Sequence, residues 1–411
     1  MGQQELIPHL FRTEFRKIIA VLCKYFGIEH IEIAEDIASE TFLSALETWT
    51  FKGVPEMPTA WLYAVAKNKA KNYVKRHHSF TKKIAGRISQ SPSEILEPEI
   101  DLSDKNITDS QLQMLFAVCN PAISKEAQIG LSLRILCGFG IDEIANALLT
   151  NKETINKRLF RAKEKLRLEK IAIEFPVEGE MNARLETVLT TLYLLFNEGY
   201  YSESQDAVLR KDFCLEAMRL TYQLIENEST NQPQVNALLS LMCFHSSRFE
   251  ARKNGSGEIV LYHDQDETLW NDELITKGAY YLHQASQGNK ISNYHLEASI
   301  AYWLTIKTDT KEKWGNVLQL YNQLLITEYS PIAALNRTFA LSKVYGKIAA
   351  IVEAEKLDLP GNPFYYALLG ELYKSIDNDK AKVNFEKAIS LAKTQTDKQT
   401  LQNKIMELAT E

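Results

Sequence analysis

Apolar side chains recur with helical spacing along most of the chain, and the clearest example lies in residues 34–49. There, apolar or small residues fall at positions i, i+3, i+4 and i+7 over four turns. The residues of this stripe are Ala34, Ile37, Ala38, Thr41, Phe42, Ala45, Leu46 and Trp49. The opposite face carries the polar residues Glu35, Asp36, Ser39, Glu40 and Glu47. The pattern predicts an amphipathic helix that buries one face and exposes an acidic one.

Breaks in the periodicity divide the chain into helical segments. A loop at 51–58 contains two prolines and a glycine, and Thr59 is a candidate N-cap for a helix that runs to about Arg76. Residues 79–107 lose the pattern and contain two proline-centred polar triplets, which indicates a flexible linker. Helical periodicity returns at 108–170, and from about residue 180 the chain is almost continuous helix.

The C-terminal segment carries a repeat-like pattern. Small and aromatic residues follow the spacing of a tetratricopeptide unit, shortened by one residue in its turn. These residues are Leu369, Gly370, Tyr373, Ala381, Phe385 and Ala388. The stretch 333–355 fits a degenerate neighbour of this unit. The sequence therefore predicts an all-α protein whose C-terminal part resembles tetratricopeptide domains.

The amino-acid composition narrows the fold classes and the cellular locations that fit this chain. The 411 residues include only 17 Gly and 11 Pro, which favours helix over a turn-rich β fold. No apolar run reaches about 18 residues, and the N-terminus lacks the basic and apolar regions of a secretory signal. The five cysteines are far apart and form no C-x-x-C pair. We therefore expect a cytoplasmic protein with reduced thiols and no disulfide framework or zinc site.

Charge is distributed unevenly. Residues 1–175 hold 24 Lys and Arg against 22 Asp and Glu, whereas residues 176–411 hold 23 against 31. Residues 67–87 contain eight basic residues and no acid, and residues 152–170 contain eight basic residues and three acids. Two compact basic segments in a chain of net charge −6 indicate two separate anion contacts, with nucleic acid as the expected partner. Solvated helix faces are the alternative interpretation.

A helix-turn-helix is the most specific local signal. Residues 141–149 predict a short helix, and Thr150 with Glu153 has the capping-box spacing at the start of a second one. The second helix turns Ile155, Leu159, Ala162 and Leu166 inward. On or beside its opposite face are the residues that we assign to duplex DNA: Thr154, Lys157, Arg158, Arg161 and Lys165. Long cationic side chains on a helix held by an apolar seam suit phosphates and base edges of the major groove. A basic amphipathic helix packed in a bundle is the alternative.

The first basic segment has a different character. Lys67, Lys71 and Lys75 fall at i, i+4 and i+8, where like charges repel one another, so a polyanion is the natural partner. Aromatic and amide side chains beside the cations suit unpaired bases, which stack on rings. The candidate residues are Trp61, Tyr63, Lys67, Asn68, Lys71, Asn72, Lys75 and Arg76. Trp61 and the nearby Tyr73 also fit as core residues.

Three segments in order resemble extracytoplasmic-function sigma factors of the sigma-70 family. They are DIASETF at 36–42, WLYAVAKN at 61–68 and RLFRAKEKLR at 158–167. The resemblance implies that the first segment docks on core RNA polymerase through Asp36, Ser39 and Glu40. It also implies that the loop at 51–61 and the helix after it open and hold the −10 promoter element, while the helix-turn-helix reads the −35 element. Ser39 replaces a glutamine usual in the family, and Asn72 replaces a frequent aspartate.

Residues 180–411 resemble the long, tetratricopeptide-like C-terminal extension of one sigma subgroup. The resemblance rests on LFNEGY at 195–200, on Asp264 to Asp266 with Trp270, and on SPIAALNR at 330–337. It favours an extension that is needed for activity, and we expect regulation by direct contact within the chain or through a protein or peptide partner. The expected domains are 1–78 (region 2), 79–107 (linker), 108–175 (region 4, helix-turn-helix) and 176–411 (regulatory extension).

Two other functions fit parts of the sequence. One is an ordinary helix-turn-helix regulator with a helical sensing domain, and the other is an adaptor whose basic patches are incidental. An enzyme is not expected, because no H-E-x-x-H or nucleophile elbow occurs. A divalent metal could be imagined at His263, Asp264, Asp266 and Glu267, but hydrogen bonds that tie down a loop beside Trp270 explain them better. We expect no cofactor, no metal and no membrane partner.

Overall fold

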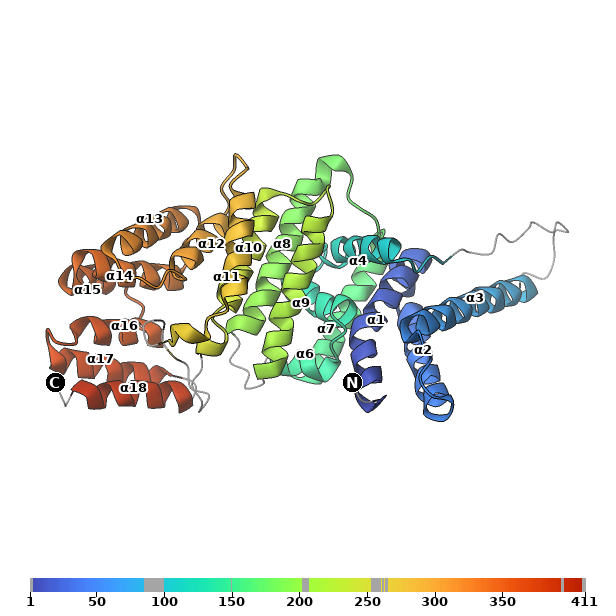
Figure 1. Ribbon diagram of the computed structural model, residues 1–411, viewed down its shortest axis with the longest axis horizontal. Coiled ribbons are helices and arrows are strands. Elements are labelled where there is room, and N and C mark those ends of the chain that lie inside the picture. The colour runs from blue at the N-terminus through green and yellow to red at the C-terminus, as the bar shows by residue number, and fades with distance from the viewer. Residues whose placement is uncertain are drawn as a thin grey trace. The chain divides into compact units, whose positions relative to one another are not determined.

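Helices make up every regular element in the part of the chain that the structure describes (Figure 1). The structure is a computed structural model, and it describes residues 3–84, 100–148, 150–201, 207–252, 260, 262, 265–392 and 395–408. The predicted all-α fold class is confirmed. None of the described helices combines the length and the apolar character that crossing a membrane requires. The chain forms two compact units, residues 1–224 and residues 225–411.

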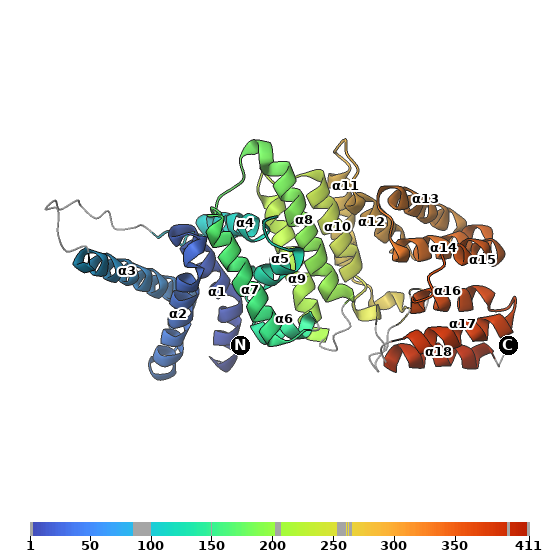
Figure 2. The same cartoon turned by 180° about the vertical axis from the view of Figure 1, so that it is seen from behind.

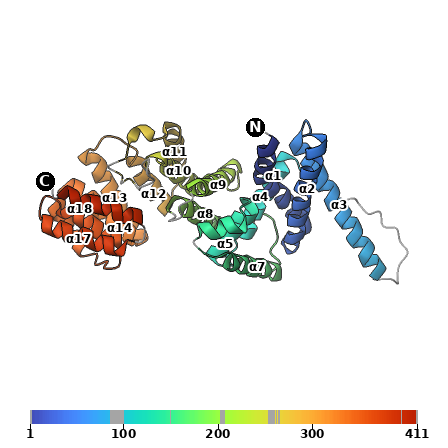
Figure 3. The ribbon, with the colours of Figure 1, turned by 90° about the horizontal axis from the view of Figure 1, so that it is seen from below.

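The first unit contains nine α-helices and two shorter helical segments among its described residues. They are α1 (Gln3–Phe26), η1 (Ile28–His30), α2 (Ile31–Lys52), α3 (Pro58–Ile84), α4 (Asp104–Val118), α5 (Lys125–Leu131), η2 (Ser132–Leu136), α6 (Ile141–Ala147), α7 (Lys152–Leu168), α8 (Glu178–Tyr201) and α9 (Ala207–Glu226). Helix α9 reaches two residues beyond the boundary. The C-terminal part of α3 extends beyond α1 and α2 (Figure 3).

Helix α1 is buried on all sides near its C-terminal end. Residues 18–23 form a continuous apolar run, and each is at most 3% exposed. A helix that is apolar all round needs cover on all sides. Helices α2 and α3 pack against α1, and so do α4 and η2 from further along the chain. Helix α1 therefore joins the N-terminal helices to the helix-turn-helix region within this unit.

The predicted stripe of α2 is buried, with one exception. Leu46 is 48% exposed, whereas the other seven stripe residues belong to the core. The burial is completed by aromatic contacts: Phe42 meets Phe11 edge to face with ring centroids 5.1 Å apart, and Trp49 meets Trp61 at 5.3 Å. Leu46 lies at the edge of the buried face, where no neighbouring helix covers enough of it.

The predicted linker at 79–107 is helical at both ends. Helix α3 continues to Ile84, and α4 begins at Asp104, with Ser103 as its N-cap. Residues 85–99 lie outside the described part of the chain. Ile100 is buried, so the chain is already anchored four residues before α4 begins.

Helices α8 and α9 belong to the first unit, although the sequence predicts a domain boundary at 175/176. Thr191 of α8 donates a hydrogen bond to the buried Gln128 of α5 at 2.8 Å. Phe213 of α9 packs edge to face on Phe139, just before α6, with ring centroids 4.5 Å apart. These buried contacts complete the core around the helix-turn-helix region.

The second unit is built from helices that pack in sequence order. They are α10 (Pro233–Ser246), α11 (Asp272–Ala285), α12 (Asn293–Trp303), α13 (Lys311–Thr327), α14 (Pro331–Tyr345), α15 (Lys347–Glu355), α16 (Pro363–Tyr373), α17 (Asn378–Leu391) and α18 (Gln395–Leu408). Close approach of α16 and α17 requires Gly370, because a Cβ there would lie 2.5 Å from the Phe385 ring. The six residues of the predicted repeat pattern are all buried.

Part of the acidic cluster beside Trp270 can be placed. Asp266 accepts hydrogen bonds from the backbone N–H and hydroxyl of Thr268, at 2.9 and 2.7 Å, and so caps the short helix η5 (Glu267–Leu269). His263 and Asp264 lie outside the described residues.

Candidate nucleic-acid and polymerase interface

The helix-turn-helix is formed by α6 and α7 (Figure 2). Each helix has its own N-terminal cap. The backbone N–H of Gly140 donates to Glu143 Oε2 at 2.6 Å ahead of α6. Asn151 Oδ1 accepts from the backbone N–H of Thr154 at 2.7 Å and caps α7. The predicted cap at Thr150 is therefore one residue too early, and Glu153 pairs with Lys157 instead. Helix α6 ends at Ala147, and residue 149 lies outside the described part of the chain.

The apolar seam of α7 lies inward as the sequence predicts. Ile155, Leu159, Ala162 and Leu166 are each at most 4% exposed. Burial of these four side chains fixes the rotation of the helix about its own axis. The polar side chains of α7 are thereby held on the outside or at the edges of the seam.

Ion pairs engage several of the cations on α7. Lys157 Nζ lies 2.6 Å from Glu153 Oε1, Lys165 Nζ lies 2.7 Å from Glu169 Oε1, and Arg167 pairs with Glu164. No ion pair joins Arg158 or Arg161 to another residue that the structure describes. Arg161 is exposed and Arg158 is half-buried. Thr154 is also half-buried, and its backbone N–H donates to the capping residue Asn151. The arginines are thus the cations of α7 best placed for an external anion.

Two apolar side chains of α7 are exposed and have no role predicted from the sequence. Phe160 is 64% exposed and lies next to Arg161, and Leu168, the last residue of the helix, is 76% exposed. For both, the signal in the sequence is a large apolar residue that lies outside the buried seam of α7.

Helix α3 packs through one row of small and apolar residues. Leu62, Ala66 and Ala70 are fully buried, and the opposite face exposes Asn68, Asn72 and Arg76. Successive positions at i, i+4 and i+8 share one side of a helix, so both rows run along its axis. Lys67 and Lys71 are half-buried beside the packed row, and Lys75 is exposed.

Two of the predicted −10 residues also serve the core. Trp61 packs edge to face on Trp49. Tyr63 donates a hydrogen bond to Glu14 Oε2 at 2.5 Å, and Glu14 also pairs with Lys17 at 3.0 Å. Burial and the Glu14 carboxylate raise the pKa of Tyr63, so its hydroxyl stays protonated and remains a donor. Both side chains are nevertheless half-exposed at the start of α3.

The outer face of α2 combines acidic and apolar side chains. Asp36, Ser39 and Glu40 are exposed, and Glu40 Oε2 lies 3.2 Å from Lys69 Nζ on α3. Leu43 and Leu46 extend this face and are 54% and 48% exposed. Leu43 has no role predicted from the sequence, although its position as an apolar residue among polar ones is a visible signal. Exposed leucines beside acids favour a protein partner over solvent alone.

Glu35 differs from its neighbours on α2. The sequence places it on the polar outer face, but its side chain is only 16% exposed. Its carboxylate accepts from Lys163 of α7 at 2.7 Å and lies 3.5 Å from Arg134 of η2. Glu35 therefore connects the N-terminal helices to the helix-turn-helix region.

Comparison with known proteins places the chain in a family. Residues 10–94 match sigma-70 region 2, and residues 184–286 match a family of unknown function, DUF6596. An uncharacterized protein of Rhizobium meliloti (strain 1021) is 31% identical over 406 residues, covering 96% of this chain and 93% of the relative. No solved structure matches. The chain belongs to the same family as this relative, and its region 2 makes it a sigma factor of the sigma-70 family.

The region 2 match defines the general activity. Sigma-70 family proteins are transcription initiation factors and not enzymes, and they direct RNA polymerase to promoters. The match implies that this chain binds core RNA polymerase and promoter DNA. It spans α1, α2 and α3, the helices that an ordinary helix-turn-helix regulator does not require.

Proposed function

We propose that the chain is a sigma factor of the extracytoplasmic-function type that is regulated by its own C-terminal half. Residues 1–78 form region 2, residues 108–175 form region 4, and the part from residue 176 onward is a tetratricopeptide-like regulatory extension. The observation that carries the proposal is the region 2 match over residues 10–94, followed within the same compact unit by a capped helix-turn-helix.

Helix α7 reads the −35 element. Arg158 and Arg161 contact bases, because neither forms an ion pair with another described residue and both project from a helix with a fixed seam. Thr154, Lys157 and Lys165 contact phosphates at the edges. The two lysines already have acidic neighbours, so their contribution to binding is smaller than that of the arginines.

Helix α3 holds the opened −10 element. The helix contains no acid over its 27 residues, so its own side chains do not repel a polyanion. Lys67, Lys71, Lys75 and Arg76 follow the phosphates, while Asn68 and Asn72 face unpaired bases. Trp61 and Tyr63 stand at the start of α3, where the strands separate.

The outer face of α2 docks on core RNA polymerase. Asp36, Ser39 and Glu40 supply polar contacts, and Leu43 and Leu46 supply apolar area beside them. An interface of this kind has an apolar centre with charges that set orientation and association rate.

Transcription reconstituted from purified components tests the proposal. The full chain is combined with core RNA polymerase from its own organism and with a library of promoter regions from the same genome. We expect promoter-specific open complexes that core polymerase alone does not form. Failure to open any promoter, with the chain folded and bound to core, would contradict the proposal.

Truncation tests regulation by the C-terminal half. The cut belongs at residue 231, ahead of α10, because α8 and α9 complete the core of the first unit. We expect transcription from the identified promoter to change by several-fold on removal of residues 232–411. A yield equal to that of the full chain would assign no regulatory role to the second unit.

A further inference from the structure

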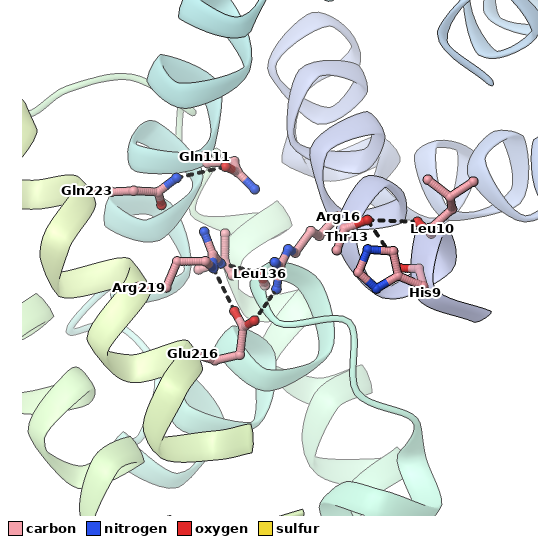
Figure 4. Close-up of polar contacts among 9 residues, drawn as sticks. All are labelled: His9, Leu10, Thr13, Arg16, Gln111, Leu136, Glu216, Arg219 and Gln223. Atoms are coloured by element: carbon pink, nitrogen blue, oxygen red, sulfur yellow. Dashed lines mark hydrogen bonds and ion pairs between the residues drawn. The ribbon is translucent and has the colours of Figure 1, made fainter. Parts of the chain in front are cut away.

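Helix α9 makes polar contacts with two parts of the first unit at once (Figure 4). Glu216 Oε1 lies 2.6 Å from Arg16 Nη1 on α1, and Glu216 Oε2 lies 2.8 Å from Arg219 Nε. Arg219 Nη2 then donates to the backbone carbonyl of Leu136 in η2 at 3.1 Å. Three residues, Arg16, Glu216 and Arg219, thus link the N-terminal helices to the helix-turn-helix region, and we call them the latch.

The latch is shielded from solvent. The side chains of Arg16 and Glu216 are 9% and 18% exposed, so their ion pair is screened much less than a surface pair. The Arg16 Nε atom is buried and has no hydrogen-bond partner among the residues that the structure describes. Loss of the Glu216 charge would leave the Arg16 guanidinium buried without compensation, which is costly.

A second ionic contact lies between the same two regions. Glu35 of α2 bonds Lys163 of α7 at 2.7 Å, with both side chains 16% exposed. Helix α7 also packs against η1. The helix proposed to read the −35 element therefore lies against the region proposed to hold the −10 element.

Promoter geometry requires these regions to separate. The −10 and −35 elements are about 25 base pairs apart, and at roughly 3.4 Å per pair this is ~85 Å along the duplex. A chain whose two DNA-binding regions touch through Glu35 and Lys163 does not reach both elements. The arrangement in the first unit is therefore a closed form.

We propose that α9 is an autoinhibitory latch, which holds the two DNA-binding regions closed through Arg16, Glu216 and Arg219 until core RNA polymerase binds. The inference rests on the proposed function. It gives that function a specific regulatory element, which lies in the first unit and ahead of the tetratricopeptide-like region.

Two native cysteines lie where opening would expose them. Cys23 is 0% exposed, and Glu35 and Lys163 both act electrostatically on its thiol. Cys137 is 4% exposed and is influenced in the same way by Glu216, Arg219 and Arg16. Burial raises the pKa of both thiols, which keeps them unreactive in the closed form. Cys243 in α10 is also buried, and burial raises its pKa to about 12, so it serves as an internal control.

Thiol labelling of the Glu216→Gln full chain, without polymerase, tests the latch. Alkylation rates are resolved by mass spectrometry of the peptides. We expect Cys23 and Cys137 to react roughly tenfold faster than in the wild type, while Cys243 stays unchanged. The matched control is Glu353→Gln, since Glu353 likewise pairs with a residue at i+3 and lies 3.9 Å from a distant arginine. Unchanged rates at Cys23 and Cys137 would overturn the latch.

A reducible crosslink provides a second, independent test in case the Glu216→Gln variant unfolds. The exposed Lys24 of α1 donates a hydrogen bond to the half-buried Asn106 of α4 at 3.1 Å, and both residues are changed to cysteine. A crosslinker that contains a disulfide, and that a reducing agent therefore cleaves, then joins the N-terminal helices to the helix-turn-helix region in the full chain. The control is the same crosslink between Asn293 of α12 and Glu328, the residue after α13, which are hydrogen-bonded at 2.7 Å.

The crosslinked chain should still bind core polymerase through the exposed face of α2, but it should lose at least about 90% of its open complexes and recover them on reduction, while the control forms them throughout. Full promoter opening by the crosslinked chain would overturn autoinhibition. If no form of the chain, wild type included, binds core, then the proposed function fails, and labelling without polymerase still decides whether α9 acts as a latch.

Discussion

The two helices proposed to contact DNA differ in the acids that accompany their cations. Helix α3 has no acid, and one of its lysines, Lys69, pairs with Glu40 of α2. Helix α7 carries Glu153 and Glu164, and both pair with cations of the same helix. The two helices have similar basic character but present it to a ligand in different ways.

The difference indicates different modes of recognition. On α7 the acids neutralise cations near both ends and leave Arg158 and Arg161, which suits base-specific reading at two positions. On α3 the row of cations lies on a helix that has no acid of its own, which suits a phosphate backbone that carries one charge at every step. Reading bases depends on single residues, whereas following a backbone depends on the sum of many contacts.

The largest effect is expected from removing the cation row of α3. The triple variant Lys67→Ala, Lys71→Ala and Lys75→Ala should reduce promoter melting roughly a hundredfold, because three phosphate contacts are lost together. The slope of log binding constant against log salt should fall by about two to three. Each single variant should have a small effect. Melting is followed with a fluorescent base in the −10 element.

A triple variant in the second unit supplies the control for this experiment. Lys307, Lys311 and Lys382 are all exposed there, and changing them to alanine removes the same charge from the chain. Their loss should leave melting and the salt slope unchanged. Equal effects of the two triple variants would mean that net charge, and not the row on α3, controls binding.

Single arginines on α7 should have the next largest effects. Arg158→Ala and Arg161→Ala should each weaken binding to the −35 duplex by about 1–3 kcal/mol and relax specificity at one base pair. Arg167→Ala is the control, because Arg167 is engaged by Glu164, and its loss should cost about 0.5 kcal/mol or less. Fluorescence anisotropy with single-base variants of the site measures both quantities. If the loss of affinity is the same for every base variant of the site, the two arginines contact phosphates and not bases.

A smaller effect is expected at the polymerase face. Asp36→Lys should weaken binding to core RNA polymerase by about 1 kcal/mol and should slow association, as charges at the rim of an interface do. Binding of the variant to −35 duplex DNA should not change. Glu180→Lys on α8 is the control, since Glu180 is also an exposed acid. Identical affinities of wild type and Asp36→Lys for core would remove Asp36 from the interface.

Local periodicity was enough to predict the helices and their buried faces. The seam of α7 and seven of the eight stripe residues on α2 are buried, because a 3.6-residue period specifies a face without knowledge of its partner. Leu46 is the exception, since the width of the covering surface depends on neighbouring helices. The roles assigned to individual site residues stay predictions.

Contacts between distant segments of the chain do not follow from local periodicity. Glu35 and Lys163 are 128 residues apart, and Arg16 and Glu216 are 200 apart, so no local pattern relates them. The uninterrupted apolar run at 18–23 was a usable signal, because it indicates a helix covered on all sides. It does not identify the covering segments, which are fixed only by the tertiary structure.

The smallest effect concerns the cap of α7, where neighbouring residues compete for one role. Asn151 accepts from the Thr154 N–H, so Asn151→Ala should destabilise the first turn by about 1 kcal/mol, while Thr150→Ala should have little effect. Hydrogen exchange at the Thr154 amide measures this local change directly, and the expected result is about fivefold faster exchange in Asn151→Ala alone. Because Arg158 and Arg161 lie farther along the helix, their −35 contacts should weaken only slightly. Faster exchange in Thr150→Ala than in Asn151→Ala would return the cap to the position that the sequence pattern favours.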